Sequence, residues 1–221
     1  MNRFEPRLDV LPKPQQALWP DLRQVPKGFV LYGGTGLSLR LGHRQSIDFD
    51  FFTSEKIIPE RLIQTIPFLA DGKVLQNESQ TLTMAIDRGG LVKVSFFGGL
   101  NMGRVRDPEE TIDGILRVAS LLDIAATKAK VVQQRAESKD YIDIIAILDH
   151  GIKLSEMLGA ARALYGDPFN PMFTIKSLSY FGDGDLHVLS QRQKQQLVLA
   201  ASERFDIPEV VRVSDALSGL C

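Results

Sequence analysis

Two acids alternate with phenylalanines in the stretch "SIDFDFF", at Asp48 and Asp50. Side chains two positions apart on a β-strand point to the same face, with their Cα atoms about 7 Å apart. Two ionised carboxylates at this separation repel each other and lose hydration unless a positive charge lies between them. Carboxylate oxygens suit Mg²⁺ or Mn²⁺. The spacing predicts that Asp48 and Asp50 are metal ligands; an exposed strand face with two solvated aspartates is the open alternative.

A glycine turn precedes this acid pair. Gly33, Gly34 and Thr35 close the apolar run "FVLYG" and open a short helix. Glycine lets a ligand approach the backbone closely, and the free amides at a helix N-terminus bind phosphate oxygens. The turn lacks the third glycine of a dinucleotide-binding fingerprint and the Gly-Lys-Ser/Thr of a P-loop. A tight turn without a ligand remains open, but the turn and the acid pair together predict a site for a nucleoside triphosphate with Mg²⁺.

A lysine interrupts an apolar helical stripe in the second half of the chain. Residues at spacings of three and four share one face of the segment "ASLLDIAATKAKVVQQR", and Lys128 lies among them. A lysine at such a position either extends along the apolar surface to reach water or meets an anion. The functional anion would be a nucleotide phosphate.

The segment "SKDYIDIIAILDH" predicts a buried helix with Asp140 and Asp143 in its first turn. Acids there complement the helix dipole after a cap at Ser138, and this account is preferred for Asp143. Asp140 is the better functional candidate of the two.

These segments together resemble a known family. "GGTGLSLRLGHRQSIDFDFF" is similar to motif I of the nucleotidyltransferase superfamily, and its arginine-bearing helix and "DFDFF" ending resemble the AbiEii/AbiGii toxin family. "LLDIAATKAKVVQQRAESKDYIDI" is similar to the later motifs of that family, an Asp-x4-Lys helix followed by Arg-x3-Lys-Asp-x2-Asp. The resemblance covers most of residues 29–148.

The resemblance implies a site and an activity. The implied catalytic residues are Asp48, Asp50, Lys128 and Asp140, with Asp48 and Asp50 as metal ligands; the nucleotide-binding residues are Gly33, Gly34, Thr35, Arg40, Lys93 and Lys139. Lys128 and Asp140 would steady the triphosphate. The implied reaction is Mg²⁺- or Mn²⁺-dependent transfer of a nucleoside monophosphate from a nucleoside triphosphate to a hydroxyl of RNA, such as a tRNA 3′ end, or of a protein. A bacterial toxin with an antitoxin partner, from a toxin–antitoxin or abortive-infection system, is the implied context.

The chain departs from the family pattern at one position. The family supplies a third carboxylate in a Lys-x-acid pattern, whereas "LVKVSFF" presents Lys93 and Ser95. A serine hydroxyl is a poor Mg²⁺ ligand and a weak base at neutral pH. Asp87 is an acid in the paired strand. The departure leaves open a non-catalytic nucleotide-binding protein with a regulatory or partner-binding role; a purely structural domain would make the whole pattern a coincidence.

The elements that must position these residues predict an α+β fold. We expect a nucleotidyltransferase-like mixed β-sheet with flanking helices, followed by a helical C-terminal half. A hairpin is expected at "RGG", residues 88–90, and a helix after Pro59. The expected domains are a core with an N-terminal extension over residues 1–115 and a helical portion over 116–221, packed as one compact unit.

Composition narrows the class of protein. The chain has 221 residues, of which 44% are hydrophobic and 24% charged, and its net charge of −1 excludes a global basic field for nucleic acid or membranes. The single cysteine, Cys221, excludes an internal disulfide framework. Without an apolar run of about 18 residues, neither a membrane span nor a signal peptide is expected, and a cytoplasmic setting is favoured. Asp183 and Asp185 lack the other ligands of a calcium loop, so a glycine-rich turn is expected there.

Overall fold

The computed structural model of the chain describes residues 2–204 and 206–218, so the terminal Cys221 lies outside the described residues. The chain divides into two compact units, Met1–Ser120 with Val213–Cys221 and Leu121–Arg212. The sequence analysis placed a boundary between residues 115 and 116. In the structure, five further residues and the C-terminal segment belong with the first unit.

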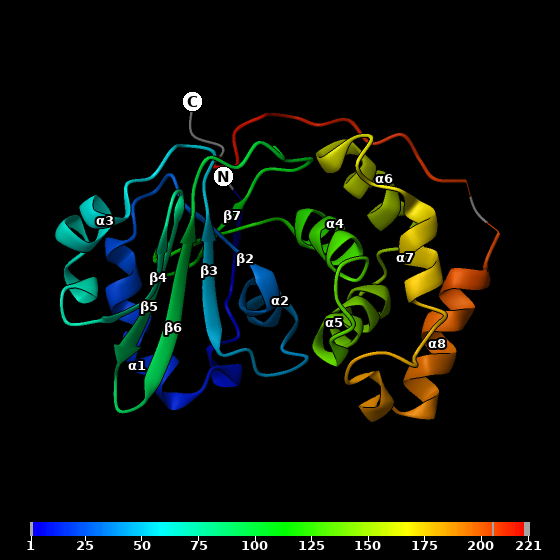
Figure 1. The fold of residues 1–221 in the computed structure, drawn as a ribbon, viewed down its shortest axis with the longest axis horizontal. Helices are drawn as coiled ribbons and strands as arrows, with labels where there is room; N and C mark the ends of the chain where they lie inside the picture. The colour runs from blue at the N-terminus through cyan, green and yellow to red at the C-terminus, as the bar shows by residue number, and fades with distance from the viewer. Residues whose placement is uncertain (1, 205, 219–221) are drawn as a thin grey trace. The chain divides into compact units, whose positions relative to one another are not determined.

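A mixed β-sheet forms the centre of the first unit (Figure 1). Its order is β1-β7-β8-β2-β3-β6-β5-β4, and the pairs β1–β7, β2–β8 and β3–β6 are parallel while the others are antiparallel. The predicted "RGG" hairpin joins β5 and β6. The strand bounds are β1 Arg3–Phe4, β2 Val30–Tyr32, β3 Asp48–Phe52, β4 Lys73–Glu78, β5 Thr81–Asp87, β6 Leu91–Phe97, β7 Glu109–Thr111 and β8 Arg117–Val118.

The two faces of the sheet differ in polarity because side chains alternate along each strand. Phe49, Phe51 and Phe96 are fully buried, and the Phe51 and Phe96 rings stack with their centroids 5.4 Å apart. Asp48 and Asp50 lie on the opposite, half-buried face of β3. The period-two alternation therefore places the acid pair on one face of the sheet and the aromatic core on the other.

Short helices flank this sheet. Helix α2 packs against β2 and β3, and α3 lies on the far side of β4–β6 from α2 (Figure 1). Pro59 occupies the first turn of α3, as predicted. The helical segments of the first unit are η1 Leu8–Val10, α1 Lys13–Leu18, η2 Trp19–Gln24, α2 Gly33–Leu41, α3 Pro59–Thr65 and η3 Pro67–Leu69.

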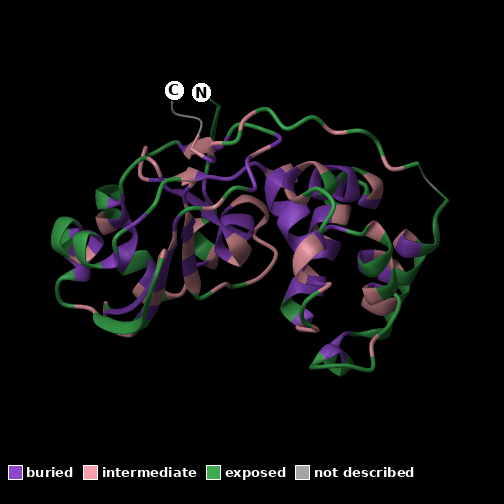
Figure 2. Cartoon of the chain, turned by 45° about the horizontal axis from the view of Figure 1, so that its top comes forward, coloured by how far each residue is buried: buried purple, intermediate pink, exposed green. Residues whose placement is uncertain are grey.

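The second unit is built from helices in the part of the chain that the structure describes. Helix α4 packs on α5 and α6, and α5 also contacts α8. Buried residues gather along α4 and α5, whereas much of α8 is exposed (Figure 2). The helices are α4 Leu121–Val131, α5 Ser138–Asp149, α6 Leu154–Tyr165, α7 Pro171–Ser177, η4 Leu186–Val188 and α8 Gln191–Ser202. Across the described residues, every helix is too short or too polar to cross a membrane.

Arg40 connects α2 to the sheet through an ion pair and hydrogen bonds. Its guanidinium pairs with Glu109 of β7 at 2.8 Å and donates to the backbone carbonyl oxygens of Val118 and Ala119 at 3.1 and 3.0 Å. It also lies over the Phe4 ring, 4.3 Å from the centroid. Since each guanidinium nitrogen donates to an atom of the same unit, Arg40 has a packing role in the fold and is not carried into the nucleotide site proposed below.

Replacing Arg40 by methionine is expected to destabilise the first unit by about 3 kcal/mol, because the half-buried Glu109 and two carbonyl oxygens lose their partner. Urea unfolding of the full chain measures the change. Arg3→Met is the matched control, since Arg3 pairs with the next residue of β7, Glu110, but is exposed, and should cost no more than about 1 kcal/mol. Equal losses in the two variants would contradict this role for Arg40.

Candidate active site

The start of α2 touches the acid pair. Gly33 has a φ of +71°, and a Cβ built on it would lie 2.8 Å from Asp50 Oδ2. Any other residue would be strained in this conformation and would displace the Asp50 carboxylate. The glycine turn and the acid pair, which the sequence analysis combined in one predicted site, therefore lie next to each other.

Thr35 holds the strand that carries the acids. It is buried, and its hydroxyl donates to the backbone carbonyl oxygen of Asp48. The Thr35 side chain therefore positions β3, and its backbone amide is the group that lies at the start of the helix. Tyr32, at the N-cap position, stacks its ring on Phe52 with 4.9 Å between centroids and supplies no capping side chain. The first amides of α2 thus keep the polarity that favours an anion.

Arg44 and Ser46 also reach the glycine turn. A Cβ on Gly34 would lie 2.6 Å from Arg44 Nη2 and 2.9 Å from Ser46 Oγ. The chain returns to this point because Gly42, with φ +66°, ends α2 in the left-handed conformation and reverses its direction. Neither Arg44 nor Ser46 is among the site residues expected from the sequence. The signal for both was the shortness of the loop between α2 and β3.

The neighbouring strand β6 supplies a lysine and a serine. Its parallel register with β3 places Lys93 opposite Asp48 and Ser95 opposite Asp50. Lys93 Nζ lies 2.9 Å from Asp48 Oδ2. The predicted nucleotide-binding lysine is therefore an ion-pair partner of one predicted metal ligand.

No third acid joins the pair within the described residues. Ser95 is buried, and the Thr83 hydroxyl donates to its oxygen at 3.3 Å. Asp87 pairs in register with Leu91, and its carboxylate accepts from the amides of Gly89 and Gly90 at 2.9 and 3.0 Å, which closes the β5–β6 hairpin. The described residues also hold no cluster of three His, Cys, Asp or Glu side chains fit for a metal.

The donor set fits one divalent cation whose remaining ligands are substrate oxygens and water. Mg²⁺ is commonly held by one or two carboxylates together with phosphates of a substrate, and it keeps several water ligands. Asp48 and Asp50 match this pattern, since both lie half-buried on the same face. A second ion held by protein carboxylates has no matching donors among the described residues.

Lys128 lies in a buried charge cluster of the second unit, which we call the lysine cluster. Its ammonium is 2.8 Å from Asp140 Oδ1 and 2.5 Å from Asp143 Oδ2, and Arg135 Nε donates to Asp140 Oδ2 at 2.8 Å. Of the two alternatives left open by the sequence, Lys128 takes the one in which it meets an anion, and within its unit the anions are two aspartates. Asp143, which the sequence analysis assigned to the helix dipole, belongs to this cluster; its i,i+3 spacing from Asp140 was the available signal.

Lys139 and Asp185 lie at the N-terminus of α5 in different roles. Lys139 is half-exposed and pairs with Glu137 at 2.7 Å. The Asp185 carboxylate accepts from the Ser138 amide and hydroxyl at 2.6 and 2.8 Å and so caps the helix. A Cβ on Gly184 would overlap the Ala136 carbonyl oxygen, so the "GDGD" turn packs directly against the start of α5. The expected glycine-rich turn thus supports the helix that carries Asp140.

The charges around Asp140 set its acidity. Burial alone raises the pKa of this carboxyl, but the opposing charge of Lys128 and the hydrogen bond from Arg135 outweigh it and hold the pKa below the ordinary 3.8. Asp140 is therefore ionised in the folded protein at neutral pH.

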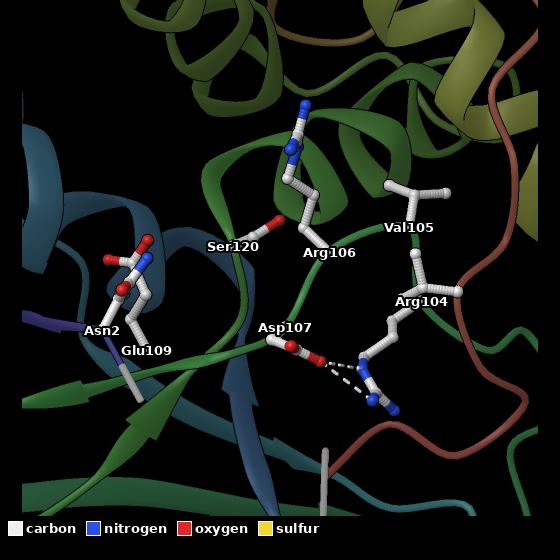
Figure 3. A pocket seen from close by; sticks show the side chains of 8 residues that line it. Asn2, Arg104, Val105, Arg106, Asp107, Glu109 and Ser120 are labelled. Carbon is white, nitrogen blue, oxygen red and sulfur yellow. Dashed lines mark hydrogen bonds and ion pairs between the residues drawn. The ribbon is translucent and has the colours of Figure 1, made fainter.

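A cavity of about 480 Å³ lies elsewhere in the first unit (Figure 3). Its charged groups include Arg104, paired with Asp107 at 2.9 Å, and Glu109, paired with Arg40. The lining residues are Asn2, Arg104, Val105, Arg106, Asp107, Glu109, Ser120 and Val213. None of the predicted site residues is among them, so this cavity is not assigned to the candidate active site.

Replacing Lys128 by methionine is expected to destabilise the second unit by about 3 to 5 kcal/mol, because the buried carboxylates of Asp140 and Asp143 lose the ammonium that they share. Hydrogen exchange of the α4 and α5 amides measures this unit separately from the sheet. The control Lys139→Met removes an exposed lysine and should cost no more than about 1 kcal/mol. Similar protection in the two variants would show that Lys128 is not the central charge.

The stability of the second unit is expected to fall below about pH 4, because the folded pKa of Asp140 is depressed and its contribution is lost as the pH falls through that value. Above the unfolded pKa the contribution is fully present. Urea unfolding near pH 5 and pH 3 should show a smaller loss in Asp140→Asn than in the wild type. Asp167→Asn, at an exposed position of the same unit, should keep the wild-type loss. An unchanged loss in Asp140→Asn would rule out this linkage.

Comparisons with known proteins agree with this architecture. An H. pylori protein described as a candidate nucleotidyltransferase has a crystal structure that matches 86% of this chain and 90% of its own, with a TM-score of 0.54 and 19% sequence identity. The predicted nucleotidyltransferase-like fold is thereby confirmed. A curated protein of Aquifex aeolicus, itself uncharacterized, is 33% identical over 162 residues, which are 70% of this chain and 74% of that protein.

The family assignment rests on a longer match. Residues 21–206 match the family model described as "Nucleotidyl transferase AbiEii toxin, Type IV TA system". This range includes the glycine turn, the acid pair and the lysine cluster, so the segments that carried the resemblance lie inside the matched region. The chain therefore belongs to the AbiEii family of nucleotidyl transferases.

Proposed function

We propose that this chain is a Mg²⁺-dependent nucleotidyltransferase that transfers a nucleoside monophosphate from a nucleoside triphosphate to a hydroxyl of RNA or protein. The contact between Gly33 and Asp50 carries the proposal. It joins a helix N-terminus that favours phosphate to a carboxylate that favours a divalent cation. A bound Mg²⁺–triphosphate satisfies both at once.

The residues of the first unit would have two roles, binding the phosphates and binding the cation. The first amides of α2, at Gly34 and Thr35, and the Arg44 guanidinium would hold phosphate oxygens. Asp48 and Asp50 would hold the cation, which when bound neutralises charge on the phosphates. The acceptor hydroxyl would lose its proton to water, and its oxygen would form a bond to the α-phosphorus while the bond from that phosphorus to the bridging oxygen breaks and pyrophosphate leaves.

The family resemblance gives the lysine cluster a part in the same reaction. Asp140 and Asp143 balance Lys128 inside the cluster, whereas Arg135 and Lys139 are about half exposed beside it. We assign Lys128 and Asp140 the role of holding the start of α5 in place, which keeps Arg135 and Lys139 at the surface of this unit. This refines the sequence prediction that Lys128 and Asp140 steady the triphosphate.

The biological setting follows from the family. Its description names a toxin of a type IV toxin–antitoxin system. We therefore propose a cytoplasmic toxin with an antitoxin partner, and a tRNA 3′ end or a protein hydroxyl as the acceptor. With a net charge of −1, the chain would have to hold an RNA acceptor by a local patch.

A second function is favoured by one observation. Ser95 lies opposite Asp50 where an acid would complete the site, and Asp87 is used to close the hairpin. A protein that binds nucleotide without transferring it, in a regulatory or partner-binding role, would need only the acid pair and the glycine turn.

The full chain is incubated with Mg²⁺, labelled nucleoside triphosphates and total cellular RNA and protein. We expect the label to enter one class of acceptor, and digestion with nuclease or protease identifies whether that acceptor is RNA or protein. Asp50→Asn is expected to lower the label at least about 100-fold, because a group acting on charge in the transition state is lost. Asp71→Asn, an exposed acid of the same unit, is the matched control.

The outcomes separate the two functions. Labelling that survives in Asp50→Asn would contradict the assignment of the acid pair. Saturable Mg²⁺-dependent nucleotide binding without any label in RNA or protein would favour the non-catalytic function.

A further inference from the structure

The two residues nearest the acid pair on β6 are unusual neighbours for a metal site. The parallel register aligns Lys93 with Asp48 and Ser95 with Asp50, and adjacent strands lie about 4.8 Å apart. All four side chains point to the same face, since they occupy alternate positions of paired strands. On the β6 side, the acid pair therefore faces one cation and one neutral hydroxyl.

Lys93 already balances one of the two carboxylates. Its ammonium lies 2.9 Å from Asp48 Oδ2, and the side chains of Lys93 and Asp48 are 43% and 27% exposed. At this exposure the pair is in contact with water and is held only weakly. A bare divalent cation would have to displace the ammonium or share Asp48 with it, and either costs affinity.

Ser95 adds no charge to offset that cost. It is 2% exposed, and its oxygen accepts from Thr83 on the next strand, which contributes a second neutral hydroxyl. The affinity of an oxygen site for a divalent cation rises with the number of charged ligands. Asp48 and Asp50, with one charge balanced by Lys93, make a weak site for a free ion.

We infer that Lys93 and Ser95 restrict the acid pair to a cation that arrives together with a nucleotide. This inference rests on the proposed function and adds the order of binding to it. The triphosphate oxygens supply the negative ligands that Ser95 does not, and the Lys93 ammonium can move from Asp48 to a phosphate. Without nucleotide, the acid pair then binds no free Mg²⁺, and the cation binds only together with the nucleotide.

Calorimetric titration of the full chain with MnCl₂, without nucleotide, tests this inference. The wild type should show no saturable binding at submillimolar Mn²⁺. The same titration in the presence of α,β-methylene triphosphate analogues, each base tried separately, should show Mn²⁺-dependent binding of at least one analogue.

Two substitutions sharpen the test. Ser95→Asp places a third carboxylate opposite Asp50 and should raise nucleotide-free Mn²⁺ affinity at least about tenfold. Lys93→Gln removes the ion-pair partner of Asp48 at a half-exposed position and should raise the nucleotide-free Mn²⁺ affinity about threefold. This variant keeps the test valid if Ser95→Asp, which buries a carboxylate, fails to fold. Leu91→Asp is the matched control, because Leu91 lies on the same strand and face but is exposed and paired with Asp87.

Each outcome decides between the inference and the function on which it rests. Tight nucleotide-free Mn²⁺ binding by the wild type overturns the inference and leaves nucleotidyl transfer intact. Equal gains in Ser95→Asp and Leu91→Asp also overturn it, since added negative charge and not a third ligand would then explain the change. Failure of every analogue to bind with Mn²⁺ overturns the proposed function and this inference with it.

Discussion

The close approach of Asp50 to Gly33 is the constraint on which the candidate active site depends. Only a residue without a Cβ leaves room for the carboxylate there, and the positive φ of Gly33 turns the chain from β2 into α2. Thr35 then ties α2 to the backbone of β3, while Arg40 ties it to β7 and β8. One turn thus sets the position of both the acid pair and the amides that we propose to bind phosphate.

Each unit contains two neighbouring aspartates with a lysine beside them, and the lysine–aspartate pair is half-exposed in the first unit and buried in the second. In each, a lysine balances aspartates that would otherwise repel each other. Lys93 does so at a half-exposed strand position, where an ion pair is weak and exchangeable. Lys128 does so in the interior, where removing one partner leaves buried charge behind. The first arrangement suits a site that accepts a ligand, and the second suits a support that stays in place.

Several parts of the site were predictable because they depend on short-range periodicity. The alternation in "SIDFDFF" placed Asp48 and Asp50 on one face, and the apolar stripe around Lys128 indicated a lysine that either reaches water or meets an anion. Asp143 and Ser46 were not predicted as site residues. Asp143 pairs with Lys128 of another helix, and Ser46 approaches Gly34 from the loop that returns after α2. Such contacts leave little trace in local sequence patterns.

The strand and helix periodicities, the glycines needed for tight turns and the family of the chain could be read from the amino-acid order alone. These features depend on backbone conformation and on residue order, which local sequence specifies. The pairing of Lys93 with Asp48, the position of Ser95 opposite Asp50 and the closing of a hairpin by Asp87 became known from the folded chain. Strand register and loop return depend on packing between residues far apart in the chain, and this packing decides which charges meet.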